Sequence, residues 1–412
     1  MSNTINCYAA YRIMASKVSL TSIRLAKEVI KELNNGLVLT HSGPPLDMEN
    51  EIPSVMRGGF IAGILFEGWA ESVPQAESML KSGHISFLSN QDFNIVAPGT
   101  GVISPSMSLA VFTNETYQRD AYVPTHEGAG KVMRFGGYST HVLDRIRWVE
   151  KVFNPALKFV LEKEGPILIN ELMSLALKTG DELHSRNITS TLLFQQKLLT
   201  RISFSLSSYN KLDEILQFLL VNNNQFFLNY GMGAAKAMLM AADGVENSTI
   251  VTSMGISNRF GIKVAGQKRW FTGNLPELVK VGYLRGYTVQ DAGAVIGDSI
   301  IMETLGLGIT ALAGAPGLWK MLSIKDFSEA LTYKDSMDQI CVGRWDQFIL
   351  PQIEQGNMPL GIDCNLVASK GITPYLGVAF GHKRIGKGII TGVGIFKAPL
   401  EPYLQVIGKG GI

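Results

Sequence analysis

Residues 249–265 read Thr249-Ile-Val-Thr-Ser-Met-Gly-Ile-Ser-Asn-Arg-Phe-Gly-Ile-Lys-Val-Ala265, a clear β signal in the middle of the chain. Two β-like runs, Thr249–Met254 and Phe260–Ala265, flank the turn-forming residues Gly255–Arg259. This arrangement predicts a β-hairpin, and Trp270–Thr272 extends the predicted sheet.

The portion before this hairpin, from His141 to Met240, has the helical period, with abundant Leu, Ile, Lys and Glu and few prolines. Other segments alternate between helical and β-like patterns. We expect helices at Ser16–Leu33, Pro74–Gly83, Ser299–Ala313 and Ile324–Cys341, and small helix-packing residues in Gly58–Ala70. We expect strands at Leu37–Leu39, Ile85–Leu88 and Leu109–Phe112, and a β-rich, glycine-rich end over Leu360–Phe396.

Composition narrows the class of protein. The 412 residues predict two or three domains, and 46% hydrophobic residues are ample for their cores. A net charge of +2 without a basic or acidic block favours small or uncharged partners over nucleic acid or a membrane surface. Three scattered cysteines and no secretory pattern at the start predict a cytoplasmic protein. Thr304–Trp319 is apolar, but it is glycine-rich and shorter than the roughly 20 residues of a membrane span, so we expect a buried helix and loop.

Reactive side chains are densest in Gly180-Asp-Glu-Leu-His-Ser-Arg-Asn187, although only 17% of the chain is charged. If this segment is helical, Asp181, His184 and Asn187 share one face, and Glu182 and Arg186 form an ion pair beside them. A carboxylate next to His184 would fix its tautomer and raise its pKa, as a general acid or base requires. The alternative is a helix start, in which Gly180 ends one helix, Asp181 caps the next and His184 is solvated.

Other candidate sites each have a structural alternative. Gly381–Gly388, with Lys383, Arg384 and Lys387, could cradle an anion or form a solvated turn. The amides Asn222–Gln225 and Asn229 could hold a carboxamide or simply break a helix. Gly231-Met-Gly233 is interpreted as helix packing. Further polar residues stand in less distinctive contexts: Glu127, Lys131 and Arg134 at helical spacing, Asp298 and Glu303 around an apolar run, and Asp363 and His382 alone.

Several strings, taken in order, resemble one bacterial family. They are Gly101-Val-Ile-Ser-Pro-Ser-Met107, Glu127-Gly-x-Gly-Lys-Val-x-Arg-Phe-Gly136, Gly180-Asp-Glu-x-His-x-Arg-Asn187, Phe226-Phe-Leu-Asn229 with Ala234-Ala-Lys236, Glu303-Thr-x-Gly-Leu-Gly308 and Gly361-Ile-Asp363. From about His41 to Pro399 the chain is similar to the YlbE/YahG-like family, which includes the large subunit of oxamate carbamoyltransferase. For the fold, the resemblance implies an α+β protein with two mixed α/β domains and a small helical domain between them. With the composition shifts, this predicts domains at 1–140, 141–222 and 223–412.

For function, the resemblance implies transfer of a carbamoyl group between phosphate and a small amide such as oxamate, in purine or allantoin nitrogen breakdown. It also implies a complex with an FdrA-like partner. We expect a small amide or ureido acid and phosphate or carbamoyl phosphate as ligands, an oligomer, and no metal or organic cofactor.

The chain departs from the family pattern in three places. Asn222-Asn-Asn-Gln225 replaces a run with an acid and an imidazole, Asp92-Phe93-Asn94 replaces paired histidines, and Lys383 is followed by Arg-Ile-Gly-Lys. Two other functions therefore stay open: a non-catalytic subunit that binds a small amide or stabilises a partner, and a metal-independent amidohydrolase.

The chemistry of carbamoyl transfer assigns roles to the candidate residues. It requires a base, an anion site for phosphate, and donors for the carbonyl oxygen on which negative charge develops. We expect His184, held by Asp181, as the base, Arg186 with Lys383 or Arg384 as the anion site, and Asn187 with Asn223 as donors. The predicted catalytic residues are Asp181, Glu182, His184, Arg186 and Asn187. The predicted substrate-binding residues are Asn94, Glu127, Lys131, Arg134, Asn223, Asn229, Glu303, Asp363, His382 and Lys383.

Overall fold

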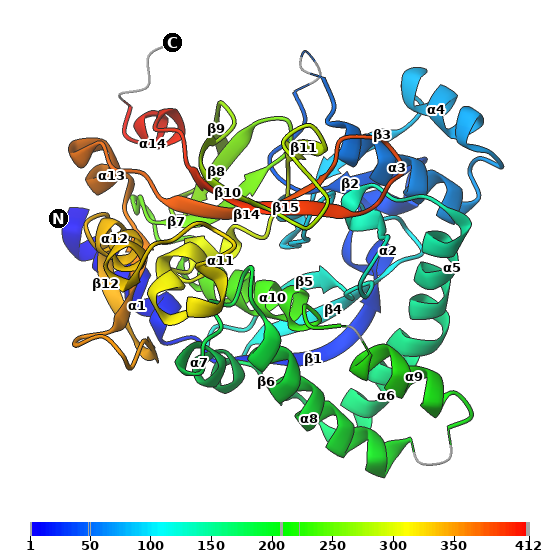
Figure 1. Cartoon of the computed structure of the whole chain (residues 1–412), viewed down its shortest axis with the longest axis horizontal. Coiled ribbons are helices and arrows are strands. Elements are labelled where there is room, and N and C mark those ends of the chain that lie inside the picture. Colours follow the sequence, from blue (N-terminus) through cyan, green and yellow to red (C-terminus); the bar gives the residue numbers. More distant parts are fainter. Residues whose placement is uncertain (1, 48, 50, 207–208, 222, 409–412) are drawn as a thin grey trace.

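The computed structural model describes residues 2–47, 49, 51–206, 209–221 and 223–408 (Figure 1). Small β-sheets and helices alternate along the chain, and helices cover the sheets on several sides. The predicted α+β class is confirmed. The domain boundaries at 140 and 222 remain a prediction.

One antiparallel sheet lies under the centre of the molecule. Its strands, in spatial order, are β5 (Arg119–Pro124), β4 (Ser108–Asn114), β1 (Val18–Leu25) and β6 (Ile167–Leu168). The helix predicted over Ser16–Leu33 is wrong, because β1 occupies its first half and only α2 (Ala26–Val29) and a short 3-10 turn follow. Val18 and Leu20 alternate into the core, and a bulge between Leu20 and Ser22 shifts the alternation to Ile23. Because of this shift, the buried residues Leu20 and Ile23 have the i, i+3 spacing that is typical of a helix.

A parallel pair of strands and two helices form the upper right of Figure 1. The elements are β2 (Val38–His41), α3 (Ser54–Glu67), α4 (Val73–Lys81) and β3 (Ser86–Ser89). They match the predicted strands and the helix expected to begin at Pro74 within a residue or two. The glycines expected in close helix packing are buried in α3, where a Cβ on Gly58 would lie 2.3 Å from the carbonyl oxygen of Gly136.

The helical middle of the chain is confirmed. Its helices are α5 (Thr140–Trp148), α6 (Asn154–Glu164), α7 (Asn170–Lys178), α8 (Ile188–Ser205), α9 (Leu212–Leu220) and α10 (Phe227–Leu239). The loop 180–187 between α7 and α8 is not helical, so the helical interpretation of the polar segment is wrong. Of the predicted run of amides, Asn222 lies outside the described residues.

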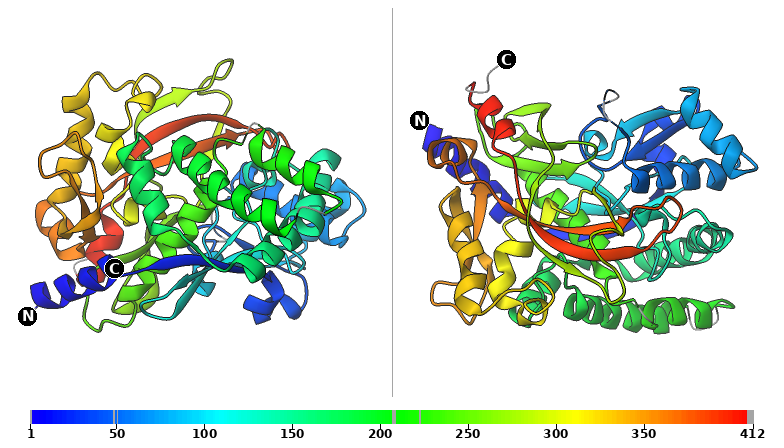
Figure 2. Two further views of the ribbon diagram at one scale, coloured as in Figure 1. Left: turned by 90° about the horizontal axis from the view of Figure 1, so that it is seen from below. Right: turned by 45° about the horizontal axis from the view of Figure 1, so that its top comes forward.

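The hairpin predicted from Thr249–Ala265 is confirmed as β7 (Val251–Ile256) and β8 (Phe260–Val264), which β9 (Gln267–Gly273) extends as predicted. A second sheet has the order β10 (Glu277–Tyr283), β15 (Ile390–Lys397), β14 (Tyr375–His382) and β11 (Ala292–Val295). Figure 2 shows β14 and β15 as a long curved ribbon across the molecule. A two-stranded pair and the remaining helices complete this portion: β12 (Cys341–Ile349), β13 (Asn357–Ile362), α11 (Ile301–Thr304), α12 (Phe327–Asp338), α13 (Cys364–Lys370) and α14 (Glu401–Val406).

Two helix predictions in this portion need correction. The helix expected over Ser299–Ala313 consists of the short α11 and a 3-10 segment, Gly308–Gly314, because Gly306 and Gly308 adopt positive φ. The helix expected to reach Cys341 ends at Asp338, and Cys341 begins β12. The apolar stretch Thr304–Trp319 is largely buried, and within the described part of the chain no helix has the length and apolar character to cross a membrane.

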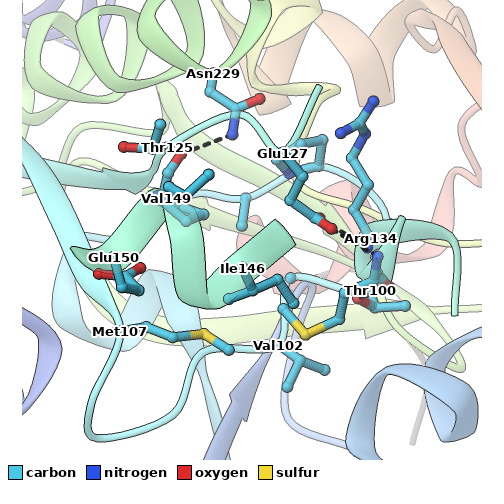
Figure 3. Close-up of a pocket in the computed structure, with 15 residues that line it drawn as sticks. Thr100, Val102, Met107, Thr125, Glu127, Arg134, Ile146, Val149, Glu150 and Asn229 are labelled. Atoms are coloured by element: carbon cyan, nitrogen blue, oxygen red, sulfur yellow. Dashed lines mark hydrogen bonds between the residues drawn. The ribbon is translucent and has the colours of Figure 1, made fainter. Parts of the chain in front are cut away.

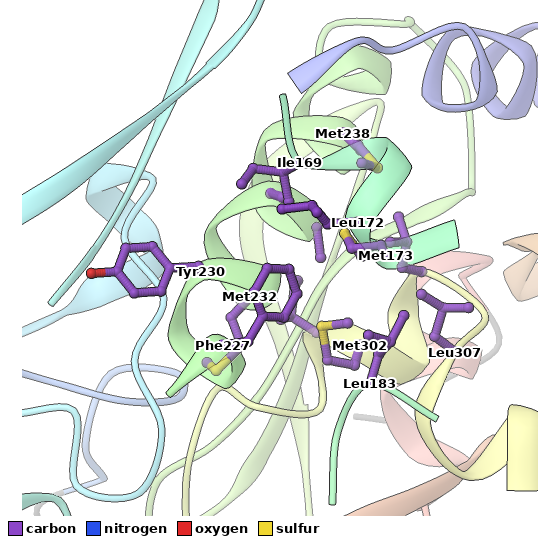
Figure 4. Packing of buried hydrophobic residues seen from close by; sticks show 14 of the residues in the cluster. Ile169, Leu172, Met173, Leu183, Phe227, Tyr230, Met232, Met238, Met302 and Leu307 are labelled. Atoms are coloured by element: carbon purple, nitrogen blue, oxygen red, sulfur yellow. The ribbon is translucent and has the colours of Figure 1, made fainter. Parts of the chain in front are cut away.

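Helix α10 is the centre of the largest hydrophobic core. Every one of its residues except Leu228 is buried, and it packs on β4, β5 and β1 as well as on α8, α11 and α1 (Ser2–Met14). Figure 4 shows its neighbours from the region of α7 and from α11. The labelled side chains are Phe227, Tyr230, Met232 and Met238 of α10 with Ile169, Leu172, Met173, Leu183, Met302 and Leu307.

Small residues allow α10 to approach the sheet closely, which confirms helix packing as the role of Gly231-Met-Gly233. A Cβ on Gly233 would lie 2.4 Å from Cδ2 of the fully buried Phe112. At Gly231 the nearest atom would be 3.3 Å away, at the edge of the Phe227 ring.

We therefore predict that Gly233→Ala destabilises the protein by about 1–3 kcal/mol, the usual cost of overpacking a core. Gly231→Ala is the matched control in the same helix, since the gain of about 1 kcal/mol in helix propensity offsets its milder contact. Urea unfolding of both variants measures the difference. Equal stabilities of the two variants would contradict the role assigned to the Gly233–Phe112 contact.

Candidate functional site

A cavity of about 390 Å³ opens at the N-terminal end of α10. Segments far apart in the sequence line it: the loops at Gly99, His126–Phe135 and His184–Ser185, residues Asn223–Leu228, and strands β14 and β15. This main pocket has the size of ordinary small-molecule sites, roughly 300–1,000 Å³.

His184 lies in the main pocket and pairs with a buried carboxylate. Its Nδ1 lies 2.9 Å from both carboxylate oxygens of Glu303, which leaves Nε2 as the ring nitrogen without a protein partner in the described structure. Burial lowers the pKa of His184, but the charge and the hydrogen bond of Glu303, with the charge of Glu182, outweigh burial and raise it. The carboxylate that pairs with His184 is therefore that of Glu303, 119 positions further along the chain, and not that of Asp181 as predicted.

The carboxylate of Glu303 is held by two backbone N–H groups, and two glycines leave room for it. Its Oε1 accepts hydrogen bonds from the N–H groups of Ile309 and Gly377, both at 3.1 Å. A Cβ on Gly308 would lie 2.1 Å from Oε1, and a Cβ on Gly377 would lie 3.1 Å from it. These glycines let the backbone surround the carboxylate, so its charge is compensated although it is fully buried.

Glu182 shapes the loop that carries His184. Its carboxylate accepts the backbone N–H groups of His184, Ser185 and Arg186. Leu183 adopts φ +70°, an uncommon conformation for a non-glycine residue. Burial raises the pKa of Glu182 to about 7, although the charge of His184 and the backbone hydrogen bonds oppose that effect. We assign Glu182 to positioning His184, not to direct contact with a ligand.

Asp181, Arg186 and Asn187 stabilise the same loop from outside the pocket lining. Asp181 accepts hydrogen bonds from the N–H and hydroxyl of Ser190 in the first turn of α8, so it caps that helix as the helix-start interpretation predicts. The solvated first-turn position that the same interpretation gives to His184 is wrong, because His184 is buried and precedes the helix. The other carboxylate oxygen of Asp181 lies 3.5 Å from Nε of Arg186. Arg186 therefore forms its ion pair with Asp181 and not, as was expected, with Glu182. The Asn187 amide donates to the carbonyl oxygen of His184 at 2.7 Å. The structure therefore does not bring Asp181 and Arg186 into the main pocket.

Arg134 supplies an incompletely paired cation to the pocket. The carboxylate of Glu127 accepts the backbone N–H groups of Met133 and Arg134, which fixes this turn. The side chain of Arg134 donates through NH2 to the carbonyl oxygen of Gly128, while its buried NH1 has no hydrogen-bond partner in the described structure. Burial lowers the pKa of Arg134, and the nearby Arg145 adds to this effect. An anion in the pocket would compensate this charge.

The sequence-based reasoning missed His126. Its Nδ1 accepts the backbone N–H of Gly128 at 3.1 Å, so the proton of the neutral ring belongs on Nε2, which is buried without a partner in the described structure. Burial, helped by Arg134 and Arg145, places the pKa of His126 well below its ordinary value. His126 is thus a neutral donor. The sequence signal for it was weak: His126 lies two residues after the end of β5 and two residues before Gly128.

The amides of Asn223, Asn224 and Gln225 also line the main pocket. Asn223 has a buried Oδ1 without a partner in the described structure. Gln225 is engaged at both ends, since it donates to the carbonyl oxygen of Ser185 and accepts from Asn187. Asn223 can therefore accept a hydrogen bond from a ligand, whereas Gln225 joins the His184 loop to the start of α10.

A small cavity of about 40 Å³ lies beside the main pocket and shares Pro98 and Arg134 with it. Figure 3 shows the apolar side chains of Val102, Met107 and Ile146 that line it. Glu127 and Asn229, both predicted to bind substrate, line this cavity and not the main pocket. The Asn229 amide donates to the carbonyl oxygen of Pro124 at 2.7 Å.

The remaining predicted binding residues lie elsewhere. Asp363 caps α13 and accepts from Thr249, and Lys131 is exposed. His382 lies 3.7 Å from Asp291, and Lys383 is exposed beside it. The Gly381–Gly388 segment packs on residues 132–138, where Gly137 bridges to Gly386, but none of its residues lines the main pocket. Asn94 lines a different cavity, near Lys236.

The main pocket of this α+β protein thus joins a carboxylate-paired imidazole to a guanidinium nitrogen and an amide oxygen that have no hydrogen-bond partner in the described structure. The family model described as oxamate carbamoyltransferase subunit AllG matches residues 85–299. The chain belongs to this family, which relates it to carbamoyltransferases.

Two relatives from Escherichia coli strain K12 match nearly the whole chain. Oxamate carbamoyltransferase subunit AllG is 34% identical over 98% of this chain and 96% of its own length. The uncharacterized protein YahG is 32% identical over 98% of this chain and 84% of its own length. A crystal structure of a conserved protein of unknown function from Enterococcus faecalis V583 has a TM-score of 0.90 at 32% identity, covering 100% of this chain and 98% of that one.

We predict that Glu303→Gln lowers the pKa of His184, because the opposing charge that raises it is removed. Titration of the histidine ring signals by NMR, with His184→Gln as assignment reference, measures this change. Asp181→Asn is the matched control, since Asp181 is the nearby carboxylate that does not contact the ring. An unchanged pKa in Glu303→Gln, or an equal drop in Asp181→Asn, would contradict the pairing.

Proposed function

We propose that this protein is a carbamoyltransferase subunit that transfers a carbamoyl group between phosphate and a small amide such as oxamate. One observation carries the proposal. His184, fixed by Glu303, shares a pocket with the unpaired NH1 of Arg134 and the unpaired Nε2–H of His126. These are the base, the anion site and the carbonyl donor that the reaction needs.

In the direction from carbamoyl phosphate, neutral His184 accepts a proton from the amide nitrogen at Nε2. The nitrogen attacks the carbamoyl carbon, and His126 donates to the carbonyl oxygen as negative charge develops on it. The C–O bond to phosphate then breaks, the phosphate leaves with the electron pair toward Arg134, and the proton from His184 passes to it. The products are an N-carbamoyl amide and phosphate.

The opposite direction uses the same groups. Because Glu303 favours the protonated form of His184, the imidazolium can donate its proton to the amide nitrogen as that nitrogen leaves the carbamoyl group. Phosphate, held by Arg134, is the nucleophile. Asn223 Oδ1 is the acceptor that would orient an amide N–H in either direction. We therefore reassign the anion site from Arg186 to Arg134 and the carbonyl donor from Asn187 to His126.

The family membership supports two further parts of the proposal. The relative from Escherichia coli is by name a subunit of oxamate carbamoyltransferase, which supports oxamate as the amide and assembly of this chain with further subunits. An FdrA-like protein as that partner, and purine or allantoin nitrogen breakdown in the cytoplasm as the setting, are part of the proposal. The second candidate is a non-catalytic subunit that binds a small amide, which the engagement of Gln225 at both ends favours.

We predict that His184→Ala reduces carbamoyl transfer by roughly 10²- to 10⁴-fold, the usual contribution of general acid–base catalysis. The assay supplies oxamate and carbamoyl phosphate to the purified chain, with and without an FdrA-like partner. His382→Ala is the control, because His382 lies outside the main pocket beside Asp291. If the wild type shows no turnover under either condition, the binding-subunit candidate replaces the catalytic one; unchanged turnover in His184→Ala removes His184 from the mechanism.

A separate prediction concerns the anion site. Arg134→Met should raise KM for carbamoyl phosphate about 10- to 100-fold, because a charged hydrogen bond contributes roughly 1.5–3 kcal/mol. Steady-state kinetics with each substrate varied in turn measures the effect. Arg147→Met is the control, since Arg147 forms a surface pair with Asp144. A rise confined to KM for oxamate would assign Arg134 to the amide instead.

A further inference from the structure

A second cavity, of about 450 Å³, lies near the C-terminal end of α10. It is lined by α10 and the turn that follows it, by strands β7, β8 and β9, and by the loop at Gln91–Asn94. Since α-helices rise 1.5 Å per residue, Lys236 in this cavity lies about 12 Å along the helix from Leu228 in the main pocket.

Lys236 is the unusual group in this cavity. Its side chain belongs to a residue that is only 2% exposed, yet Nζ has one hydrogen bond in the described structure, to the hydroxyl oxygen of Ser253 at 2.7 Å. No carboxylate of the described residues lies within 4.0 Å of Nζ. A buried ammonium group with one neutral partner has two N–H donors to spare.

The rest of the lining also favours an anion. Lys263 is neutralised by Asp92, which also accepts from Trp270. Asp243 acts on Lys236 through its charge but does not form an ion pair with it in the described structure. The charged side chains of the lining are four cations and two carboxylates, which leaves an excess of positive charge: Arg119, Lys236, Lys263 and Lys268 against Asp92 and Asp243. Ser253 accepts from Lys236, so its own hydroxyl proton can be donated to a ligand.

We propose that this cavity is a second ligand site, separate from the main pocket, in which Lys236 binds a small oxoanion, a phosphate or a carboxylate. The ligand would complete the hydrogen bonds of the buried ammonium group and balance the excess charge of the lining. Ser253 contributes a second donor from the neighbouring strand β7.

A lysine elsewhere in the fold shows what Lys236 lacks. Lys334 in α12 is 3% exposed, but its Nζ lies 2.8 Å from the carboxylate of Asp338. It also lines none of the cavities described above. The buried charge of Lys334 is therefore balanced by a carboxylate that contacts it, whereas the buried Lys236 lines a cavity and has only a hydroxyl partner.

Calorimetric titration with inorganic phosphate, and separately with acetate, tests the proposal. All titrations use the Arg134→Met background, so that phosphate binding in the main pocket is weakened and contributes less to the measured heat. We expect Lys236→Met to weaken binding of the preferred anion about 10- to 100-fold, because charge-assisted hydrogen bonds are lost. Lys334→Met is the matched control and should leave the affinity unchanged. Tighter binding of phosphate or of acetate identifies the class of oxoanion.

A second measurement keeps the full set of side chains at the site and does not depend on the folding of Lys236→Met. Burial lowers the pKa of Lys236 to about 8, with Lys263 acting in the same direction and Asp243, Asp298 and Asp92 opposing it. Anion affinity in the Arg134→Met background should therefore fall as the pH rises from 7 to 9. Absence of binding for both anions, equal affinity in Lys236→Met, or an affinity that does not change across this pH range would each overturn the proposal.

Discussion

The contact between Gly233 and the ring of Phe112 sets the distance between α10 and the sheet that it crosses. No side chain fits between them, so the helix backbone lies directly on β4. The strands, helices and loops that pack on α10 come from most of the chain, and their positions depend on this approach. Both cavities follow from it, because each lies at one end of a buried helix whose middle is too closely packed to hold a ligand.

The second constraint is the buried carboxylate of Glu303. A full negative charge in a core requires donors on several sides, and here two backbone N–H groups and one imidazole supply them. A side chain at Gly308 would displace the carboxylate, since its Cβ would lie 2.1 Å from Oε1, and a Cβ at Gly377 would lie in tight contact with the same oxygen at 3.1 Å. The ring of His184 is thus oriented by Glu303 of α11, which residues of a 3-10 segment and of β14 hold in turn, while Glu182 of its own loop binds its backbone.

The sequence predicted elements whose signal is local. The β7–β8 hairpin and the helical middle have regular patterns that tertiary contacts did not override. Of the catalytic residues predicted in Gly180–Asn187, His184 lines the main pocket and the other four do not. The strand β1 was mistaken for a helix, because its bulge at Leu20–Ser22 breaks the alternation of buried residues. The partner of His184 could not be predicted, since Asp181 is near in sequence while Glu303 is near only after folding. His126 was missed for the same reason: its significance comes from an unpaired Nε2 that only the packing around it creates.

Charged groups near the two cavities include two kinds that differ in their hydrogen bonds. Glu127, Glu182 and Asp181 accept backbone N–H groups, and these bonds fix loops. Arg134 instead has a buried NH1 without an acceptor in the described structure, and Lys236 has one neutral acceptor, Ser253, with N–H donors to spare. Arg134 lines the cavity at the N-terminal end of α10, and Lys236 lines the cavity near its C-terminal end. An unsatisfied buried cation destabilises a fold unless a ligand compensates it. Buried cations without a carboxylate partner are therefore stronger indicators of ligand sites in this chain than a high density of polar residues in the sequence. The densest polar segment, Gly180–Asn187, consists mostly of groups that hold the backbone of a loop.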